Sequence, residues 1–341
     1  MHRAHRRLPS LLAALGALAL LPRITTAHHS SALVYDRAKI IEAEGSITEV
    51  EWTNPHVRFK MRGTTPDGRE RVWNIESNSV SIVSRFGLSA DLVAVGNHVR
   101  IAGNPGRVRD DVMWVTNMLL PNGAEILFGA GIPARFSGRT IGSDVRTAVT
   151  ADTGDRGLFR VWTNATAPPD FWGDRLPLTE AAVAARAAHN PATDDPTLNC
   201  TPKGMPYIME EPYPVEFVDE GERLLLKLEE YDTVRRISMT GNADGRHNGG
   251  AARLGTSIGR WEGSTLVVDT DDIDYEFVNG NGIPLGPDAA IEERFTMNAD
   301  GSRLDYTMTI NDSSTFTEPV TLHKSWEWRP GEQVRPYNCR K

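Results

Sequence analysis

Two adjacent histidines, His28 and His29, follow the small residues Thr25 to Ala27, which resemble a signal-peptidase site. Cleavage after Ala27 would make His28 the first residue, where its amine and its ring nitrogen can chelate one metal ion. A second imidazole, from His29 or His56, would complete the ligand set, and imidazole suits copper and zinc. We therefore expect a copper or zinc site here. The alternative is a solvated chain start and a His56 that only satisfies a turn.

A second group of reactive side chains lies further along the chain. Glu230, Arg235 and His247 are close in sequence around one predicted hairpin, with Asp232 on the same strand face as Glu230. A buried carboxylate beside Arg or His can work as a general acid or base, so these three are candidate catalytic residues. The alternative is that hairpin charges are solvated and that Glu–Arg pairs across strands only stabilise the sheet.

Only two cysteines are present, Cys200 and Cys339. In an exported protein the expected arrangement is a disulfide between them, which would join the start of the C-terminal module to the last residues of the chain. A reactive or metal-bound thiol pair is the alternative, but the C-x-x-C spacing typical of such pairs is missing.

Residues 1–27 have the order of a secretory leader: three arginines, an apolar stretch from Leu8 to Leu21, then small residues. The apolar stretch is too short for a membrane span and no second candidate follows, so we expect a periplasmic or secreted protein without an integral membrane segment. Four of the 37 basic residues lie in this leader, which leaves 33 against 45 acidic residues, or about −12. That charge argues against nucleic-acid binding. Nothing in the sequence indicates the oligomeric state.

Residues 28–120 have the pattern of a small β-barrel. Val57, Phe59 and Met61 alternate with charged residues, which predicts a half-buried strand that returns in a hairpin over residues 71–76. Further strands are expected at residues 99–102 and 112–118, and one short helix at residues 79–86. Five or six strands with one helix favour a barrel of the oligonucleotide-binding type, a fold name that carries no function with it.

Residues 121–199 are rich in Gly, Pro, Asp and Thr and show no strand alternation, so we expect a connector. It contains one predicted helix, from Thr179 to His189, with Thr179 as its cap. A structureless loop this long is improbable, so part of it should pack against the modules. The expected anchors are its aromatic residues: Phe159, Trp162, Phe171 and Trp172.

Residues 200–341 return to strands. About eight are expected, at Val215 to Val218, Leu224 to Tyr231, Val234 to Thr240, Ile258 to Trp261, Leu266 to Thr270, Ile291 to Met297, Leu304 to Ile310 and Val320 to Trp328. This spacing predicts a larger antiparallel β-barrel, lipocalin-like, or a sandwich, and the whole chain is therefore all-β. Such a barrel can hold one small ligand.

The remaining aromatic and imidazole groups are assigned structural roles. Trp261, Trp326 and Trp328 are expected in the core, with pocket lining as the alternative. His98, His189 and His323 lack partner spacing and are expected at the surface. Nucleophile-elbow, H-E-x-x-H, Walker and dinucleotide motifs are absent from the sequence.

Two segments resemble known exported families. His28-His29-Ser30, the run Trp52 to His56 (WTNPH) and GNHVRIAGNPGR at residues 96–107 resemble an exported bacterial family of unknown function, over about residues 28–120. The second half is similar to the C-terminal module of other exported proteins through CTPKGMP at residues 200–206 and GRWEGSTLVVD at residues 259–269. The resemblance implies this architecture and no particular activity.

Two hypotheses about function follow. The first is an exported binding protein that holds a small apolar ligand in the C-terminal barrel and copper or zinc at the mature N-terminus. The second is a cofactor-free lyase, isomerase or hydrolase that uses carboxylate and His at the barrel mouth. An enclosed pocket with convergent acid, Arg and His would favour the enzyme.

Overall fold

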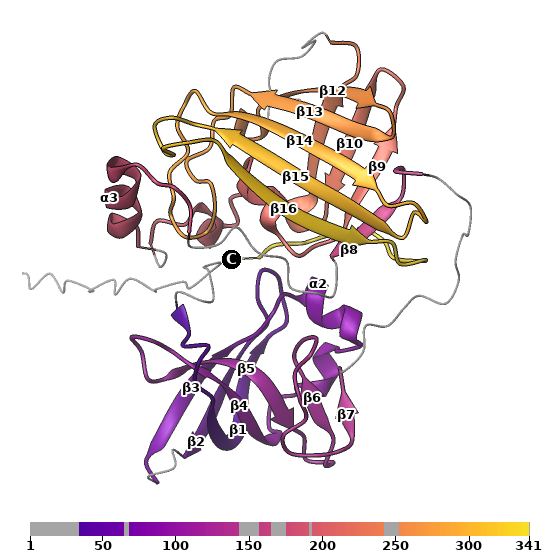
Figure 1. Cartoon of the computed structure of the whole chain (residues 1–341). Helices are drawn as coiled ribbons and strands as arrows, with labels where there is room; N and C mark the ends of the chain where they lie inside the picture. Colours follow the sequence, from indigo (N-terminus) through magenta and orange to yellow (C-terminus); the bar gives the residue numbers. More distant parts are fainter. Residues whose placement is uncertain are drawn as a thin grey trace, which may run out of the picture.

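The computed structural model describes residues 34–64, 68–142, 157–164, 175–190, 193–241 and 252–340. Two β modules lie one beside the other, and α3 (Glu180–Ala188) lies at the side of the larger module (Figure 1). The predicted all-β fold with two barrels is confirmed. Short 3-10 helices punctuate the chain: η1 Ser84–Phe86, η2 Ala90–Leu92, η3 Pro196–Asn199, η4 Tyr207–Glu210, η5 Glu230–Asp232 and η6 Ala252–Leu254.

The N-terminal module is a five-stranded barrel. Its strands are β1 Ile41–Glu51, β2 Arg58–Thr64, β3 Glu70–Glu76, β4 His98–Pro105 and β5 Val112–Leu119. They pair in the order β3-β2-β1-β4-β5, and a parallel β3–β5 pairing closes the ring. The predicted alternation is confirmed, because Val57, Phe59 and Met61 are buried in one core.

The predicted helix at residues 79–86 forms as α2 (Val80–Val83) followed by η1. The Ser79 hydroxyl caps α2 by accepting a hydrogen bond from the Ile82 backbone N–H. Gly87 ends the segment with φ 76°, a left-handed conformation that glycine adopts without strain.

The predicted connector contributes strands to both modules. β6 (Glu125–Leu127) and β7 (Thr140–Ile141) extend the N-terminal sheet beyond β5, and β8 (Val161–Asn164) belongs to the large barrel. The predicted helix forms as α3, with the Thr179 side chain as its N-cap. Of the four expected anchors, Trp162 is fully buried and Phe159 packs against the same core, whereas Phe171 and Trp172 lie outside the described residues.

The C-terminal module is a closed barrel of nine strands. Its ring order is β10-β11-β12-β13-β14-β15-β16-β8-β9, and every pair is antiparallel except β11–β12. The strands not yet placed are β9 Val215–Asp219, β10 Arg223–Leu228, β11 Thr233–Ser238, β12 Thr256–Glu262, β13 Thr265–Asp271, β14 Ala290–Met297, β15 Arg303–Asn311 and β16 Val320–Glu327. A closed ring settles the choice between barrel and sandwich in favour of the barrel.

Large side chains fill the interior of this barrel. Phe217, Phe295, Tyr306 and Trp326 pack ring against ring at centroid distances of 4.8–6.4 Å. Trp326 is fully buried, as predicted, whereas Trp261 is not a core residue. The interior therefore resembles a packed core more than a ligand chamber.

The predicted strand Leu224 to Tyr231 ends earlier than expected. β10 stops at Leu228, and residues 230–232 form η5, in which Tyr231 and Asp232 have φ values of 54° and 51°. The assumption of alternating strand faces for residues 229–232 was therefore wrong, because left-handed residues turn the chain and break the period of two.

The disulfide between Cys200 and Cys339 is confirmed, with an S–S distance of 2.07 Å. It ties the last residues of the chain to the segment that enters β9. Within the described residues, no helix has the length and apolar character needed to cross a membrane.

Candidate functional site

One end of the large barrel has a groove that is large enough for a small molecule. It lies where the β9–β10 turn, the end of β11 and the end of β12 meet, and we call it the mouth. Its volume is about 370 Å³, within the range of small-molecule sites. Its lining residues are Phe159, Asp219, Gly221, Leu224, Met239, Gly259, Arg260 and Trp261.

Trp261 is the principal apolar surface of the mouth. It pairs with the fully buried Leu266 across β12–β13, two positions beyond the buried Gly259, so it occupies an inward-facing position of the barrel. Because it stands at the open end, 46% of it is exposed to solvent. Phe159 meets it edge-on at a centroid distance of 6.4 Å. The ring is thus held on one side and accessible on another.

Gly259 leaves the room that Met239 occupies in the mouth. A Cβ atom at this position would lie 2.6 Å from the Met239 sulfur and 2.8 Å from Ile237 Cγ2. Any larger residue would therefore displace Met239, whose flexible thioether adapts well to varied apolar ligands.

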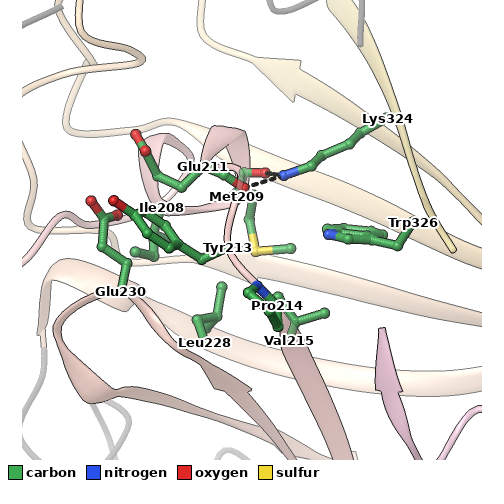
Figure 2. Close-up of a pocket in the computed structure, with 10 residues that line it drawn as sticks. All are labelled: Ile208, Met209, Glu211, Tyr213, Pro214, Val215, Leu228, Glu230, Lys324 and Trp326. Atoms are coloured by element: carbon green, nitrogen blue, oxygen red, sulfur yellow. Dashed lines mark hydrogen bonds between the residues drawn. The ribbon is translucent and has the colours of Figure 1, made fainter. Parts of the chain in front are cut away.

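A cluster of buried charges lies at the other end of the same barrel, where β9 begins and β10 ends. Figure 2 shows Glu211, Glu230 and Lys324 of this cluster. Lys203 Nζ is 2.5 Å from Glu211 Oε1 and 2.8 Å from Glu230 Oε1, and it lies 4.5 Å from the Tyr207 ring centroid. Lys203 and Glu230 are almost completely buried. One ammonium group therefore contacts two carboxyl groups away from water.

Lys324 reaches the same cluster from β16. Its Nζ donates to the backbone carbonyls of Met209 at 3.0 Å and Glu211 at 2.5 Å. Between Lys324 and Glu230 lies a cavity of about 10 Å³, lined also by Tyr213 and Trp326 (Figure 2). That space fits about one water molecule and no organic substrate.

Burial shifts the pKa values of Glu230 and Lys324, at the two ends of this cavity, in the direction that favours the neutral form of each group. Desolvation, reinforced by the nearby Glu211 carboxylate, raises the pKa of Glu230 to about 8 despite the attraction of Lys203. Desolvation also lowers the pKa of Lys324 to about 8, against the opposing effect of Glu211. Such groups can exchange protons near neutral pH, so the cluster has acid–base chemistry available but no space for a substrate.

Arg235 belongs to a different network, inside the barrel. Its guanidinium pairs with Glu293, donates to Ser257 Oγ at 3.1 Å and bonds Thr270 Oγ1 at 2.6 Å. Glu293 also accepts from the Tyr306 hydroxyl at 2.7 Å. Arg235 and Glu293 are 0% exposed, so this pair is part of the core.

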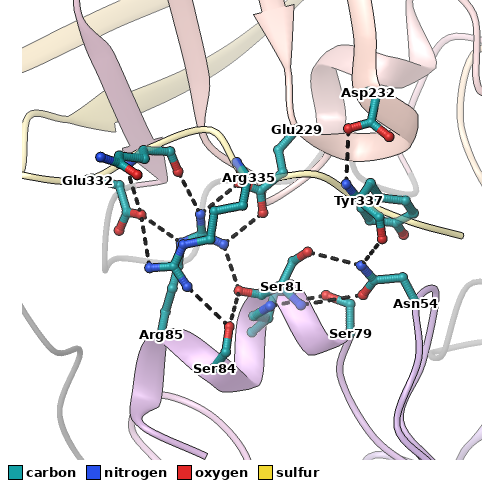
Figure 3. Close-up of polar contacts among 12 residues, drawn as sticks. Asn54, Ser79, Ser81, Ser84, Arg85, Glu229, Asp232, Glu332, Arg335 and Tyr337 are labelled. Atoms are coloured by element: carbon teal, nitrogen blue, oxygen red, sulfur yellow. Dashed lines mark hydrogen bonds and ion pairs between the residues drawn. The ribbon is translucent and has the colours of Figure 1, made fainter. Parts of the chain in front are cut away.

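A third network joins the two modules (Figure 3). Arg85, just after α2, donates to both carboxylate oxygens of Glu229 at 2.7 Å and pairs with Glu332 at 3.0 Å. The backbone N–H of Arg335 also donates to Glu229, at 2.9 Å. The C-terminal segment is therefore held between the N-terminal module and the barrel.

The WTNPH run lies at this same interface. The Asn54 side chain donates to the Tyr337 carbonyl and to Ser81 Oγ, and the Asn54 carbonyl accepts from the Arg340 N–H at 3.1 Å. His56 is buried, with Nδ1 2.8 Å from the Ser77 carbonyl and its ring edge-on to Trp114. The motif thus has a structural role in docking the C-terminal segment.

The structure tests the predicted site residues only in part. His28, His29 and His247 lie outside the described residues. Glu230 and Arg235 have different partners, in the end cluster and in the core. No group of three or more His, Cys, Asp or Glu side chains among the described residues is arranged to hold a metal ion, so the N-terminal copper or zinc site stays a prediction.

Sequence reasoning missed two buried ionisable residues, Lys203 and Lys324. Lys203 lies within CTPKGMP, between Pro202 and Gly204 and shortly after Cys200. A lysine in such a constrained turn was the available sequence signal of a buried position. Lys324 lies on the same face of β16 as Leu322 and Trp326, so the alternation of this strand was the available signal that it points inward. His98 and His323 are exposed as predicted, whereas the His189 ring is half-buried and packs edge-on against Phe277 at 5.1 Å.

Comparison with known proteins places only the first part of the chain. Residues 17–112 match the model of a family described as "Family of unknown function (DUF6152)". This range covers the WTNPH run and most of the small barrel, as the resemblance predicted. No curated protein and no solved structure matches the chain.

Proposed function

We propose that this chain is an exported small-molecule-binding protein whose ligand occupies the mouth of the large barrel. The mouth lies outside residues 17–112, the part of the chain that matches a family model. The observation that carries the proposal is a groove of about 370 Å³ with a half-exposed tryptophan at an inward-facing position. Mouths of β-barrels are frequent ligand sites. Export is supported by the leader-like residues 1–27 and by the disulfide.

Because the interior of the barrel is packed, the expected ligand site moves from the interior to the mouth. A ligand deep inside the barrel would have to displace Phe295, Tyr306 and Trp326, which are fully buried. At the mouth, Phe159, Met239 and Trp261 already offer apolar surface to solvent, and the buried Leu224 completes the apolar lining. Binding there therefore needs no opening of the core.

A fragment screen by ligand-observed NMR tests this proposal. We expect weak binders in the wild-type protein that lose binding in Trp261→Ala and in Gly259→Val, which pushes Met239 into the mouth. Val95→Ala, an exposed apolar residue of the other module, is the control that should bind normally. Hits that bind the mouth variants as well as the wild type would remove the mouth from consideration.

A second candidate function is a cofactor-free lyase, isomerase or hydrolase that uses the buried cluster. It is favoured by Glu230 and Lys324, whose pKa values of about 8 suit proton exchange at neutral pH. A substrate would require the segment 200–214 to move, because the present cavity holds about one water molecule. Turnover of ester or hydroxy-acid substrates that disappears in Glu230→Gln would support it, and turnover that persists would contradict it.

The predicted metal site is tested independently of both. Natively processed protein should bind about one copper ion per chain, through His28 with His29 or His56. A variant that retains Met before His28 has no free histidine amine and should not bind. Equal metal content in the two preparations would contradict the prediction.

A further inference from the structure

We propose that the ligand of the mouth is a small organic cation with a quaternary or tertiary ammonium group. This inference rests on the proposed function of the mouth and names the chemistry that fits it. Three features carry it: an accessible indole, the Asp219 carboxylate on the lining, and the prior engagement of Arg260, the arginine that lines the mouth.

The accessible indole is Trp261. Tryptophan has the strongest ring quadrupole of the aromatic side chains and attracts cations to its face. With 46% of the residue exposed and Phe159 packed edge-on against it, the ring is held in place before any ligand arrives. Met239 adds a polarizable thioether beside it. Methylated ammonium groups are bulky and weakly hydrated, so they suit such a surface.

The arginine that lines the mouth is already neutralised. Arg260 pairs with Asp269, with Glu262 at 3.0 Å and with Glu292 at 3.6 Å. The hydrogen bonds that Arg260 donates to Glu262 and Asp269 raise its pKa, because these carboxylates favour its charged form. Arg260 is therefore not available to bind an anionic ligand.

The carboxylate on the lining of the mouth is that of Asp219, whereas the partners of Arg260 lie on the outer face of the sheet. On that outer face Arg294 shares Glu262 and Glu292 with Arg260, at 2.7 and 3.7 Å. These two arginines therefore meet three carboxylates. Asp219 lies on the lining itself, where its Oδ1 accepts a local bond from the Gly221 N–H at 2.8 Å. The local charge favours a cation over a neutral molecule or an anion.

Three probes of equal shape and different charge separate these contributions. Choline, 3,3-dimethyl-1-butanol and 3,3-dimethylbutanoate present nearly the same methylated head as a cation, a neutral molecule and an anion. We expect ligand-observed NMR titration of the full mature chain to show choline binding at least about fivefold tighter than the alcohol, with no measurable binding of the anion. The preference for choline should decrease as salt is raised.

Variants identify the groups responsible. Trp261→Ala should abolish choline binding and Trp261→Phe should retain part of it, with thermal unfolding as the check on folding. Asp219→Asn should weaken choline binding more than binding of the alcohol, so that the preference for choline decreases. Equal affinity for choline and the alcohol would overturn the inference while leaving the mouth as a binding site. No binding of any probe would overturn it too, and the fragment screen would then decide whether the mouth binds anything.

Discussion

At the scale of single residues, the buried charged groups have the largest expected effects on the free energy of unfolding. Arg235 and Glu293 lie in the barrel core without exposure to water, and the hydroxyls of Ser257, Thr270 and Tyr306 satisfy their remaining bonding positions. Removing one member of a buried pair leaves an uncompensated charge, whereas replacing both can be nearly neutral.

Arg235→Met should therefore lower the free energy of unfolding by about 3–5 kcal/mol. The double variant Arg235→Met/Glu293→Gln should recover much of that loss, because the introduced side-chain amide is uncharged and can still accept from the Tyr306 hydroxyl. Urea unfolding of the wild type and both variants measures this. A single variant within about 1 kcal/mol of the wild type would show that the pair is not buried as described.

Glu230 gives the protein a specific pH dependence. Its pKa is raised from 4.5 to about 8, so between these values the folded protein holds a proton that the unfolded chain has lost. Stability from this group is full below pH 4.5 and is lost as pH rises toward 8, with a slope of up to about 1.4 kcal/mol per pH unit. Lys324, lowered from 10.5 to about 8, acts in the window above pH 8, where stability rises with pH.

Glu230→Gln should flatten the decline in unfolding free energy between pH 5 and pH 7.5. The amide resembles the protonated acid, so no proton is exchanged on unfolding at this position. Urea titrations at several pH values give the slopes, with Glu262→Gln, an exposed carboxylate, as the control. An unchanged slope in Glu230→Gln would mean that Glu230 is ionised in the folded protein.

Residue types alone could predict only part of this chemistry. The Cys200–Cys339 bridge followed from the count of cysteines and the expected export. The pairing of Glu230 with Lys203, 27 positions away in sequence, did not, because a contact at that distance depends on how a turn and a crossing segment meet. Burial decides whether a charge is reactive, and local sequence does not give burial.

At the scale of elements, the C-terminal segment connects the two modules. Arg85 holds Glu229, which is fully buried and also accepts from Arg335, while Asn54 holds the carbonyl of Tyr337 (Figure 3). The contact is thus made by a helix end, a strand turn and a tail that are far apart in sequence.

Arg85→Ala should loosen the two modules. It leaves Glu229 buried without its guanidinium partner, so the interface rather than either barrel is destabilised. We expect a larger radius of gyration in solution scattering and faster proteolysis within residues 329–340. Arg109→Ala, which removes an exposed ion pair with Asp111 inside the small barrel, should change neither. Unchanged scattering and proteolysis in Arg85→Ala would argue against this contact.

Strands and helix were predictable where a single period or cap dominates. Phe59 and Met61 alternate cleanly and lie in the core, and the hydroxyls of Ser79 and Thr179 cap the helices that follow them. The prediction was wrong at residues 229–232, because two left-handed residues turn the chain there. Strands β6, β7 and β8 were not predicted, because each is short and depends on a neighbouring strand for its formation.

At the scale of the whole molecule, the disulfide fixes the C-terminal segment to the segment that leads into β9. It closes a loop with a sequence separation of 139 residues. Constraining a loop of that length in the unfolded chain stabilises the folded state by about 2–5 kcal/mol. Because the tail also lies between the modules, the bridge supports the interface as well as the barrel.

Cys200→Ser/Cys339→Ser should lower the free energy of unfolding by about 2–5 kcal/mol and make the tail more sensitive to protease. The wild type treated with reductant should behave in the same way. Thermal unfolding and mass spectrometry of the cleavage products measure both effects. Equal stability of the oxidised and the serine proteins would contradict this role.

Above all, we propose that the mouth at the Trp261 end of the barrel binds small molecules. The most direct test is the ¹⁵N–¹H spectrum of the tryptophan indoles, assigned with Trp261→Phe, during titration with the fragments that bind. We expect the Trp261 signal to shift and to saturate while the signals of the buried Trp162 and Trp326 remain in place. Saturable shifts at the buried tryptophans with none at Trp261 would contradict it.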